Sequence, residues 1–581
     1  MKVTSAKPSS YSPASLLTGP KGRVRLLTLL GIALPIGAFF GYVWCWALYI
    51  PYQDDMALIF AVNDFEENPL AKLPGILMEQ LNDHRIVFAK LAALISYLSL
   101  GYIHFRGLVL AGYANLLLLG YGLYLFFRTT RLPLAYFLPV PFIIFNPYVY
   151  QISLWGLVSF QVPLVIAFSL LSLHALYTAM RPAWALVWAV CATFSSGSGL
   201  LCFLLGGFLL IVERRYRVLA WWALGFALTM SAYFFEYRFS SATQLPAWSE
   251  LVGIFLTNLT VFSGSYLRIF SDSKALVMML LLGATILGLY GLLFLRRVLG
   301  ASTKAQQTLA AVFPSQANWL LHAGFLTLLA TGALIALARS GGGILELASD
   351  RFHLYSSAFL ALFYLVLVAS LSPVLQKWLL RVGLAAAVFS NAYAYLHIEP
   401  ARDSWYTSLS ADAYNYPNHG FFLHQYNHMP DQDSTFYRHC RFPTIFSETT
   451  IQRIWQGSAH GENPFNSHLN FSLKRVKTPV DSPIYPMADL VMQLDSGLRL
   501  PQTGILMILS ATDRPGQVYL VAPWRTRASV IHWLQTGDYY TNTLSVYFPD
   551  KLPSGTYGVS LCWKQETGLV PVLNTTHVLK L

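Results

Sequence analysis

Residues 24–50 of the chain read VRLLTLLGIALPIGAFFGYVWCWALYI, and residues 51–55 follow directly with PYQDD. The first stretch is longer than the roughly 20 apolar residues that a transmembrane helix needs. It is also too long for the apolar core of a signal peptide and lacks a clear small-residue cleavage site, so we expect it to be retained as the first membrane span. The acid pair Asp54 and Asp55 then lies at a membrane surface.

The composition of the whole chain is that of a membrane protein. Of its 581 residues, 55% are hydrophobic, 15% are aromatic and only 11% are charged, whereas soluble globular proteins carry about 25% charged residues. A mean hydropathy of +0.49 leaves too little polar surface to cover a soluble protein of this size. The same figures exclude a disordered, coiled-coil or collagen-like chain, and five cysteines are too few for a disulfide scaffold.

Eleven apolar stretches predict an α-helical polytopic membrane domain over residues 24–399, behind a cytoplasmic, disordered tail of residues 1–23. Two of the stretches, 183–195 and 198–212, are too short for full crossings. They predict a re-entrant or broken hairpin around the turn Ser195–Gly199. The stretches are 24–50, 105–127, 132–149, 157–178, 183–195, 198–212, 217–236, 275–295, 317–338, 353–372 and 378–398.

The distribution of charge indicates the orientation of these spans. With the N-terminus in the cytoplasm, the inner side holds sixteen basic residues and one acid, Glu213, whereas the outer loops before residue 400 hold nine basic and thirteen acidic residues. This is the positive-inside rule of multi-pass proteins, here of a plasma or bacterial inner membrane. The net charge of +12 therefore reflects topology, and no nucleic-acid partner is implied. Residues 51–104 form the first outer loop, and residues 237–274 form another.

Residues 400–581 differ in character, because no apolar run in them is long enough to span a membrane. Short β-forming runs broken by turn signals at 513–516 and 553–555 predict a β-rich extracytoplasmic domain, a small sandwich or barrel. Cys440 and Cys562 both fall in this domain, where an oxidising compartment permits a disulfide, and bridged and free thiols both remain open. The four runs are 504–510, 517–521, 544–548 and 556–562.

Every polar cluster of the membrane domain falls on the outer side. Asp54 and Asp55 lie between aromatic residues at a span end. Either they are a solvated loop end, or partial desolvation and mutual repulsion keep one carboxylate available as a base. His84 and Arg85 open the stretch 85–103, which we expect to form an interfacial helix. Either they bind a phosphate at the helix start, or Arg85 extends its charge to the interface.

Further polar and aromatic residues lie at outer span ends. Trp155 and Gln161 begin a span, and Glu236 and Tyr237 end one. Trp155 and Tyr237 have a simpler alternative as members of the aromatic belt at the membrane interface.

Arg351 and His353 lie at the outer end of a later span. A cation there is unfavourable unless it is paired or faces a polar cavity. The metal-binding motifs His-x-x-x-His and Cys-x-x-Cys do not occur in the sequence. Two alternatives therefore stay open: the protein holds no metal ion, or it holds a Mg²⁺ or Mn²⁺ ion near the acid pair.

With these features the chain resembles the GT-C superfamily of glycosyltransferases, which includes protein O-mannosyltransferases, the aminoarabinose transferase of lipid A and mycobacterial arabinofuranosyltransferases. Members place an acidic pair in the first outer loop, follow it with surface helices and ten or more spans, and often end in an extracytoplasmic domain. Asp54-Asp55 matches the acidic pair, and 82–85 and 349–353 resemble segments of uncharacterised bacterial members. Many protein mannosyltransferases have Asp-Glu instead, so a mannosyl donor is not indicated.

The resemblance implies a polyprenyl-phosphate sugar as donor. The acceptor would be a hydroxyl of an outer-face glycan, lipid or secreted protein such as a pilin, and transfer would occur with inversion. Asp54 would be the base and Asp55 its partner. The implied phosphate-binding residues are His84, Arg85, Arg351 and His353, and those for the acceptor or sugar are Trp155, Gln161, Glu236 and Tyr237. A transporter or flippase, and a non-catalytic scaffold for glycan assembly, remain as alternatives.

Overall fold

The computed structural model describes residues 20–69, 72–178, 182–238, 247–270, 275–299, 313–341, 350–425, 435–442, 472–474, 490–493, 503–514, 516–528, 530–546, 552–565 and 568–580. The chain forms two compact units, each built from separate stretches of sequence. The helical unit comprises Met1–Cys45, Tyr113–Val149 and Val162–Tyr395, and the mixed unit comprises Trp46–Gly112, Tyr150–Gln161 and Leu396–Leu581. The whole of the expected first outer loop, residues 51–104, thus belongs to the same unit as the C-terminal region.

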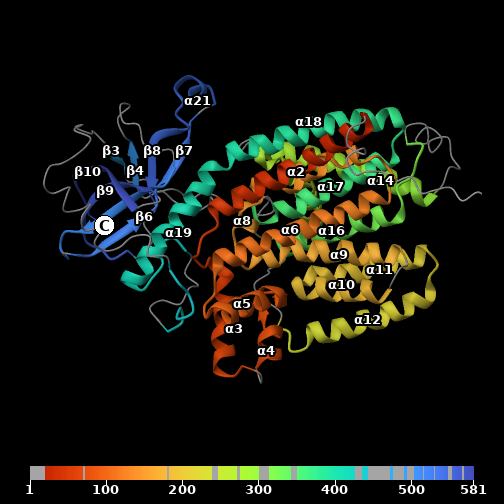
Figure 1. The fold of residues 1–581 in the computed structure, drawn as a ribbon, viewed down its shortest axis with the longest axis horizontal. Coiled ribbons are helices and arrows are strands. Elements are labelled where there is room, and N and C mark those ends of the chain that lie inside the picture. Colours follow the sequence, from red (N-terminus) through yellow and green to blue (C-terminus); the bar gives the residue numbers. More distant parts are fainter. Residues whose placement is uncertain are drawn as a thin grey trace, which may run out of the picture. The chain divides into compact units, whose positions relative to one another are not determined.

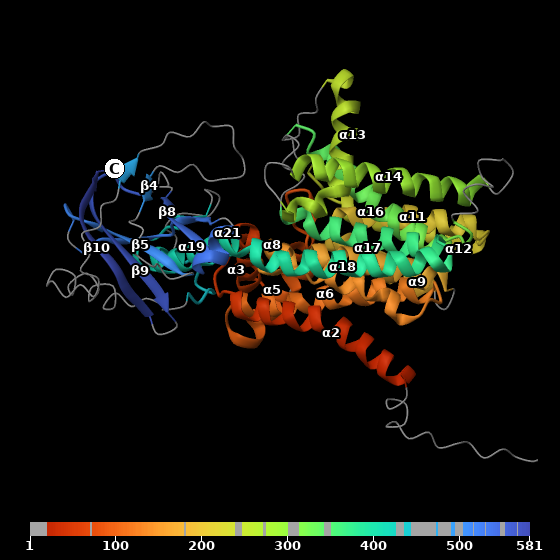
Figure 2. The same ribbon diagram turned by 90° about the horizontal axis from the view of Figure 1, so that it is seen from above.

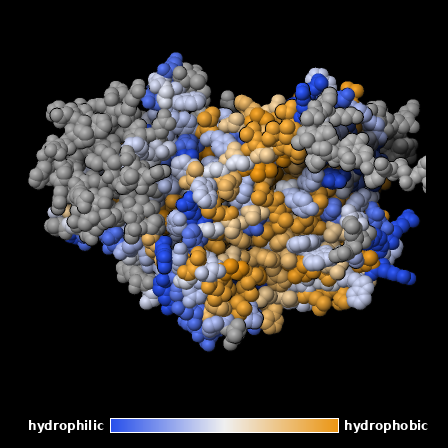
Figure 3. Space-filling model, viewed as in Figure 1, coloured by the Kyte–Doolittle hydropathy of each residue, from blue (hydrophilic) through white to orange (hydrophobic). Residues whose placement is uncertain are grey.

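Within the described residues, eight helices are long and apolar enough to cross a membrane, as expected of a multi-pass membrane protein. Those of the helical unit lie largely side by side in Figure 1, and hydrophobic residues cover much of this unit's face in Figure 3. The eight helices are α2 (Pro20–Trp46), α6 (Phe105–Arg128), α9 (Val162–Tyr177), α13 (Trp248–Gly264), α14 (Ala275–Leu299), α16 (Trp319–Ala338), α17 (His353–Ser370) and α18 (Pro373–His397).

The predicted short hairpin is confirmed as two short helices, α10 (Pro182–Ser195) and α11 (Leu200–Val212), joined by the 3-10 turn η5 (Gly197–Gly199). A Cβ atom at Gly199 would lie 2.2 Å from the backbone carbon of Ala192, so only glycine fits at this turn. Each helix is about 20 Å long, shorter than the roughly 30 Å hydrocarbon core of a bilayer. That this hairpin enters the membrane without crossing it stays a prediction. The next predicted span, 217–236, is the helix α12 (Tyr216–Phe234).

The predicted span 132–149 is wrong. Its four prolines interrupt the helix, because proline removes an amide donor and clashes with the preceding turn. The longest helix that remains there has six residues and rises only about 9 Å. The segment consists of η2 (Leu134–Phe137), α7 (Pro139–Ile144) and the 3-10 turn η3 (Pro147–Val149).

The expected outer loop 237–274 contains α13, a 17-residue helix that the sequence reading missed. The side-chain nitrogen of its buried Asn258 donates a hydrogen bond to the carbonyl of Ala336 at 3.3 Å, whereas its Oδ1 atom has no hydrogen-bond partner among the described residues. The helix crosses α14 steeply in Figure 2. Glycines let the two backbones touch there, since a Cβ atom at Gly264 or Gly283 would lie 1.9 Å from a carbonyl oxygen of the other helix.

The C-terminal part of the mixed unit contains two four-stranded antiparallel sheets, and all four predicted β-runs coincide with strands, except that residues 547–548 of one run lie outside the described residues. One sheet has the order β10-β9-β5-β6 and the other β3-β4-β8-β7. The strands are β3 (Ser472–Lys474), β4 (Leu490–Gln493), β5 (Ile505–Ala511), β6 (Val518–Val521), β7 (Trp524–Arg527), β8 (Tyr540–Val546), β9 (Thr556–Gln565) and β10 (Gly568–Lys580), with one short helix, α21 (Val530–Thr536).

This region is not uniformly β-rich, because the helix α19 (Glu399–His419) covers one sheet. Strand β5 is buried on both faces: alternate residues such as Met507 pack into a core shared with the second sheet, and Leu506 packs against α19. Asn415 of α19 exchanges two hydrogen bonds with the backbone of Leu520, at 2.7 and 3.0 Å. Its amide thus occupies the outer edge of β6, which would otherwise expose unpaired backbone groups.

The two cysteines of this region are both free in the structure, so the disulfide alternative is not realised. Cys562 is buried in β9, where its thiol lies 3.5 Å from the carbonyl oxygen of Leu506. Cys440 instead pairs with Ile103 in an isolated β-bridge.

The first outer loop folds into helices. The predicted interfacial helix is confirmed as a helix, α5 (Val87–Leu100), preceded by α3 (Met56–Glu67), α4 (Leu73–Met78) and a tiny hairpin of β1 (Gln80–Leu81) and β2 (His84–Arg85). Its position at a membrane interface stays a prediction.

Candidate active site

The acid pair lies on a strained turn. Gln53, the first residue of the 3-10 turn η1 (Gln53–Asp55), has φ +41°, in the left-handed region that non-glycine residues avoid. The buried side chain of Gln425 holds this turn at two points. Its Oε1 accepts the backbone amide of Gln53 at 3.1 Å, and its Nε2 donates to the carbonyl of Pro51 at 3.1 Å. Strain of this kind persists only where the surroundings determine it, and it is frequent at functional sites.

Asp55 is the buried member of the pair, with only 1% of its surface exposed. One carboxylate oxygen accepts the amide of Tyr52 at 2.9 Å, and the other accepts the amide of Leu157 at 2.7 Å. Gly156 permits this approach, because a Cβ atom there would lie 3.2 Å from the carboxylate. Asp55 therefore ties the turn to residues 150–161, the segment that contains α8 (Tyr150–Ser153) and η4 (Val158–Phe160).

The environment of Asp55 favours its protonated form. Burial, with a smaller contribution from the charge of Asp54, raises the pKa of the Asp55 carboxyl to about 7, and the backbone amides of Tyr52, Leu157 and Gly156 oppose this rise. Asp54 belongs to the same turn and is only partly buried. The two carboxyls thus differ: one is fixed by backbone amides, and the other is the more accessible.

Aromatic rings surround the turn. The Tyr52 ring lies 4.9 Å from that of Trp155 and 4.0 Å from that of Trp405 in α19, and Tyr150 lies 5.8 Å from Trp405. Trp155 is 7% exposed, and its indole Nε1 is buried with no hydrogen-bond partner among the described residues. Buried indole N–H groups normally have an acceptor, so this donor is suited to an oxygen atom of a ligand or a water molecule.

A strap of residues 435–442 packs against the first outer loop near the acid pair. The Glu66 carboxylate lies 2.8 Å from the Nε2 atom of His439 and forms an ion pair with Arg438 at 3.0 Å. The amide of Ile103 donates to the carbonyl of His439 at 2.9 Å. Burial and the charge of Asp55 both raise the pKa of the Cys440 thiol, which keeps it neutral. Sequence reasoning missed the strap, Gln425 and Trp405, because each lies more than 300 residues from the acid pair.

His84 and Arg85 do not occupy the position that the sequence predicted. The helix α5 begins at Val87, so neither residue lies in its first turn. They are consecutive in β2, and consecutive strand side chains point to opposite faces. Arg85 is 4% exposed and donates to the carbonyl of Met78, so it supports the loop from within. Their binding of a phosphate stays a prediction.

Four of the predicted site residues belong to the helical unit. Arg351 lies in the 3-10 turn η8 (Asp350–Phe352), with its guanidinium carbon 5.0 Å from the centre of the Phe352 ring. His353 begins α17, is 3% exposed and lies between the rings of Tyr148 and Tyr266, at 4.6 and 5.4 Å.

The other two lie at the end of α12. Glu236 is exposed and has φ +51°, and the ring of Tyr237 packs on those of Phe234 and Tyr233. In the mixed unit, Gln161 is partly buried and directly follows η4. Of the ten predicted residues, the structure brings Asp54, Asp55 and Trp155 together.

Among the described residues, no group of three or more His, Cys, Asp or Glu side chains could hold a metal ion. No model of a known protein family matches the chain, and no curated protein matches it. The case for a function therefore depends on the geometry of the acid pair and its surroundings.

Proposed function

We propose that the chain is a membrane glycosyltransferase that moves a sugar from a polyprenyl-phosphate donor to an acceptor hydroxyl, with inversion. The observation that carries the proposal is the acid pair on a strained turn directly after the first span, beside the indole N–H of Trp155, which has no hydrogen-bond partner in the described part of the chain. A carboxylate, an indole donor and aromatic faces are the groups that orient a hydroxylated ring and remove a proton from it.

The unequal burial of the two acids assigns their roles. Asp54 is the general base, because it is the more accessible carboxylate. Asp55 is a positioning residue, since both of its oxygens accept backbone amides and hold the turn in place. Its proton equilibrium near pH 7 also limits the charge that accumulates beside Asp54. A general base of this kind typically contributes 10²–10⁴-fold to a rate.

The leaving phosphate requires cationic or donor groups. Arg351 and His353 in the helical unit, and His84 and Arg85 in the mixed unit, keep this assignment as part of the proposal. Trp155, Gln161, Glu236 and Tyr237 keep theirs for the sugar or acceptor. The orientation with a cytoplasmic N-terminus, an extracytoplasmic C-terminal region and a plasma or bacterial inner membrane follows from the positive-inside rule.

The test begins with cells that lack the protein. Mass spectrometry of their lipid-linked sugars and surface glycans identifies the donor that accumulates and the product that is lost. Turnover of that donor is then measured in membranes that contain the full chain or its variants.

We expect Asp54→Asn to lower turnover by about 10²-fold or more, because the amide cannot accept the proton, while donor binding is retained. Asp64→Asn is the matched control, a partly exposed acid of α3 in the same loop. Near-normal turnover in the double variant Asp54→Asn/Asp55→Asn would contradict a carboxylate base in this loop.

A further inference from the structure

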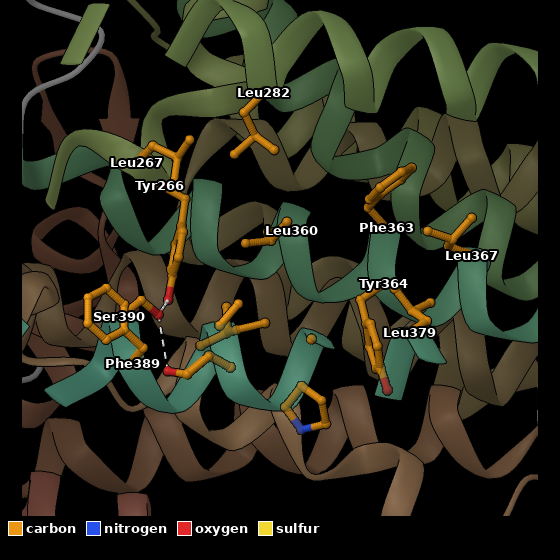
Figure 4. Close-up of a pocket in the computed structure, with 15 residues that line it drawn as sticks. Tyr266, Leu267, Leu282, Leu360, Phe363, Tyr364, Leu367, Leu379, Phe389 and Ser390 are labelled. Atoms are coloured by element: carbon orange, nitrogen blue, oxygen red, sulfur yellow. Dashed lines mark hydrogen bonds between the residues drawn. The ribbon is translucent and has the colours of Figure 1, made fainter. Parts of the chain in front are cut away.

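The helical unit contains an apolar cavity of about 310 Å³ between α14, α17 and α18, and the described residues that line it are all uncharged. Tyr266 and Ser390 meet at one end of it, where their hydroxyls are 2.8 Å apart (Figure 4). The hydroxyl of Tyr364, also on the lining, donates to the carbonyl of Tyr136 at 2.8 Å. The hydroxyls of this cavity are therefore already paired, and a buried acid that the proposed mechanism does not use lies elsewhere, in the mixed unit.

Asp412 of α19 is this acid, and none of its side chain is exposed. One carboxyl oxygen accepts the backbone amides of Leu423 at 2.7 Å and His424 at 3.1 Å. The same oxygen lies 3.1 Å from the imidazole Nδ1 atom of His424. A carboxyl group is unfavourable in the interior unless hydrogen bonds satisfy it, and here they come from residues 421–425. Asp412 thus fixes this segment, which we call the connector, shortly after the end of α19.

His424 joins the connector to the C-terminal sheets. Ala522, the residue directly after β6, donates its backbone amide to the Nε2 atom of His424 at 2.9 Å. Because an amide nitrogen can only donate, Nε2 is the acceptor, and the proton of the neutral imidazole lies on Nδ1, where it faces Asp412. The imidazole therefore makes one hydrogen bond to α19 and one to the end of β6, and only this tautomer makes both.

The next residue of the connector holds the turn of the acid pair. Gln425 accepts the amide of Gln53 and donates to the carbonyl of Pro51, both at 3.1 Å. Leu423, on the other side of His424, is 3% exposed and packs in the core shared by the two sheets. Three consecutive residues thus contact the sheet core, the end of β6 and the turn. Since stiff, planar peptide units join them, a displacement of His424 also displaces Gln425.

We propose that His424 is a positioning residue for the acid pair, which acts through Gln425 and links the strained turn to the C-terminal sheets. Loss of the hydrogen bond from Ala522 would release the connector and, with it, the hold of Gln425 on the turn. The left-handed conformation of Gln53 is unfavourable by itself, so the turn that carries Asp54 would then relax. The link is a property of the fold, and only its effect on turnover rests on the proposed function.

Hydrogen exchange of the purified full chain, followed by mass spectrometry, tests the link without any substrate. One peptide covers the turn, residues 52–56, and another covers β6 and its end, residues 518–522. In His424→Asn, the shorter side chain can still donate to Asp412 but cannot reach the amide of Ala522. We expect exchange in both peptides to be about fivefold faster or more, because the amide loses its partner and the turn loses its support.

Two further variants separate the link from a general loosening of the sheet. His424→Gln can place its side-chain oxygen near the position of Nε2, so it should restore slow exchange in both peptides. Asn415→Leu is the matched control, because it removes two hydrogen bonds from Leu520 in the same strand but does not change the connector. It should speed exchange in the β6 peptide and leave the turn peptide unchanged.

Gln425→Ala examines the link from its other end, and it tests the proposal even if His424→Asn does not fold. Coupling between two sites is reciprocal, so removing the hold of Gln425 on the turn should also speed exchange in the β6 peptide. Adding His424→Asn to Gln425→Ala should give no further change in the turn peptide, because His424 acts through Gln425.

An unchanged turn peptide in His424→Asn, or an unchanged β6 peptide in Gln425→Ala, would overturn the link. Equal opening of the turn in Asn415→Leu would overturn it too, as would fast exchange in His424→Gln or additional opening of the turn in the double variant. Because no substrate is present, a chain that shows the link but transfers no sugar would contradict only the proposed function.

Discussion

Replacing Asp55 by asparagine tests the geometry of the candidate active site without any substrate. The carboxylate accepts the amide of Tyr52 on one oxygen and that of Leu157 on the other, at 2.9 and 2.7 Å. An asparagine side chain has nearly the same shape but only one acceptor oxygen. Its NH₂ group would face one of the two backbone donors, so one buried N–H loses its partner.

The expected effect follows from that lost partner. Leaving a buried donor unsatisfied costs about 1–3 kcal/mol, which corresponds to about 5–150-fold in an opening equilibrium. The cost falls on the turn and on its contact with residues 150–161, because the bond from Tyr52 lies within the turn and the bond from Leu157 joins it to that segment. We expect this cost to appear as local opening of these two segments under native conditions.

Hydrogen exchange of the purified full chain, followed by mass spectrometry, measures this opening. Peptides that cover residues 150–161 should exchange about 5–150-fold faster in Asp55→Asn than in the unmodified protein. Asp54→Asn is the control, because it removes the charge of the neighbouring acid and leaves both bonds of Asp55 in place. Faster exchange in Asp54→Asn than in Asp55→Asn would refute the assignment of Asp55 as the residue that joins the two segments.

Three further predictions concern stability. The pKa of the Asp55 carboxyl is raised from an ordinary value near 3.8 to about 7, so the stability that Asp55 contributes is fully present below pH 4 and is lost as the pH rises through 7. In thermal unfolding, the free-energy advantage of the unmodified protein over Asp55→Asn should therefore fall by about 2–4 kcal/mol between pH 4 and 8. A difference that stays constant with pH would contradict this prediction. Gly264→Ala should lower the unfolding temperature, because its Cβ atom would meet a carbonyl oxygen at 1.9 Å, whereas Gly253→Ala in the same helix has open space and should not. Asn415→Leu should make the C-terminal sheets sensitive to limited proteolysis, because it leaves two backbone groups of β6 unpaired. The control Asn418→Leu changes an exposed residue and should resist proteolysis like the unmodified chain. Equal sensitivity of the two variants would exclude the role of Asn415 in pairing the edge of β6.

The fold could be predicted from sequence where a single periodicity decides it. The run 504–510 is a short, continuous apolar stretch, the run 556–562 alternates polar and apolar residues, and both are bounded by turn residues and are strands. The prediction failed where tertiary packing decides. Prolines break the apolar segment 132–149 into short helical pieces, and the side-chain nitrogen of the buried Asn258 in α13 donates to a carbonyl of α16, a contact that sequence cannot show.

Some features of the candidate site could likewise be predicted from the sequence, and others could not. Asp54 and Asp55 could be placed at a span end, because that follows from hydrophobic length and charge alone. Which acid is buried could not be predicted, since it depends on Leu157 and Gly156, about 100 residues later. Gln425 and Trp405 carry no motif of their own. They contribute to the candidate site only because the fold places them beside the acid pair, and long-range packing determines that placement.

The residues that hold the acid pair in place lie far apart in the sequence, and this matters for the proposed proton transfer. A base at the end of a flexible loop would lose much of its effect, because proton transfer requires the acceptor oxygen to be held near the reacting hydroxyl. Here the turn is held from one side by Gln425 and from the other by the amide of Leu157 through Asp55. The left-handed conformation of Gln53 is unfavourable by itself and is maintained only by these contacts. The position of Asp54 therefore depends on two distant segments of the mixed unit, so a substitution at Gln425 should reduce turnover without changing either acid.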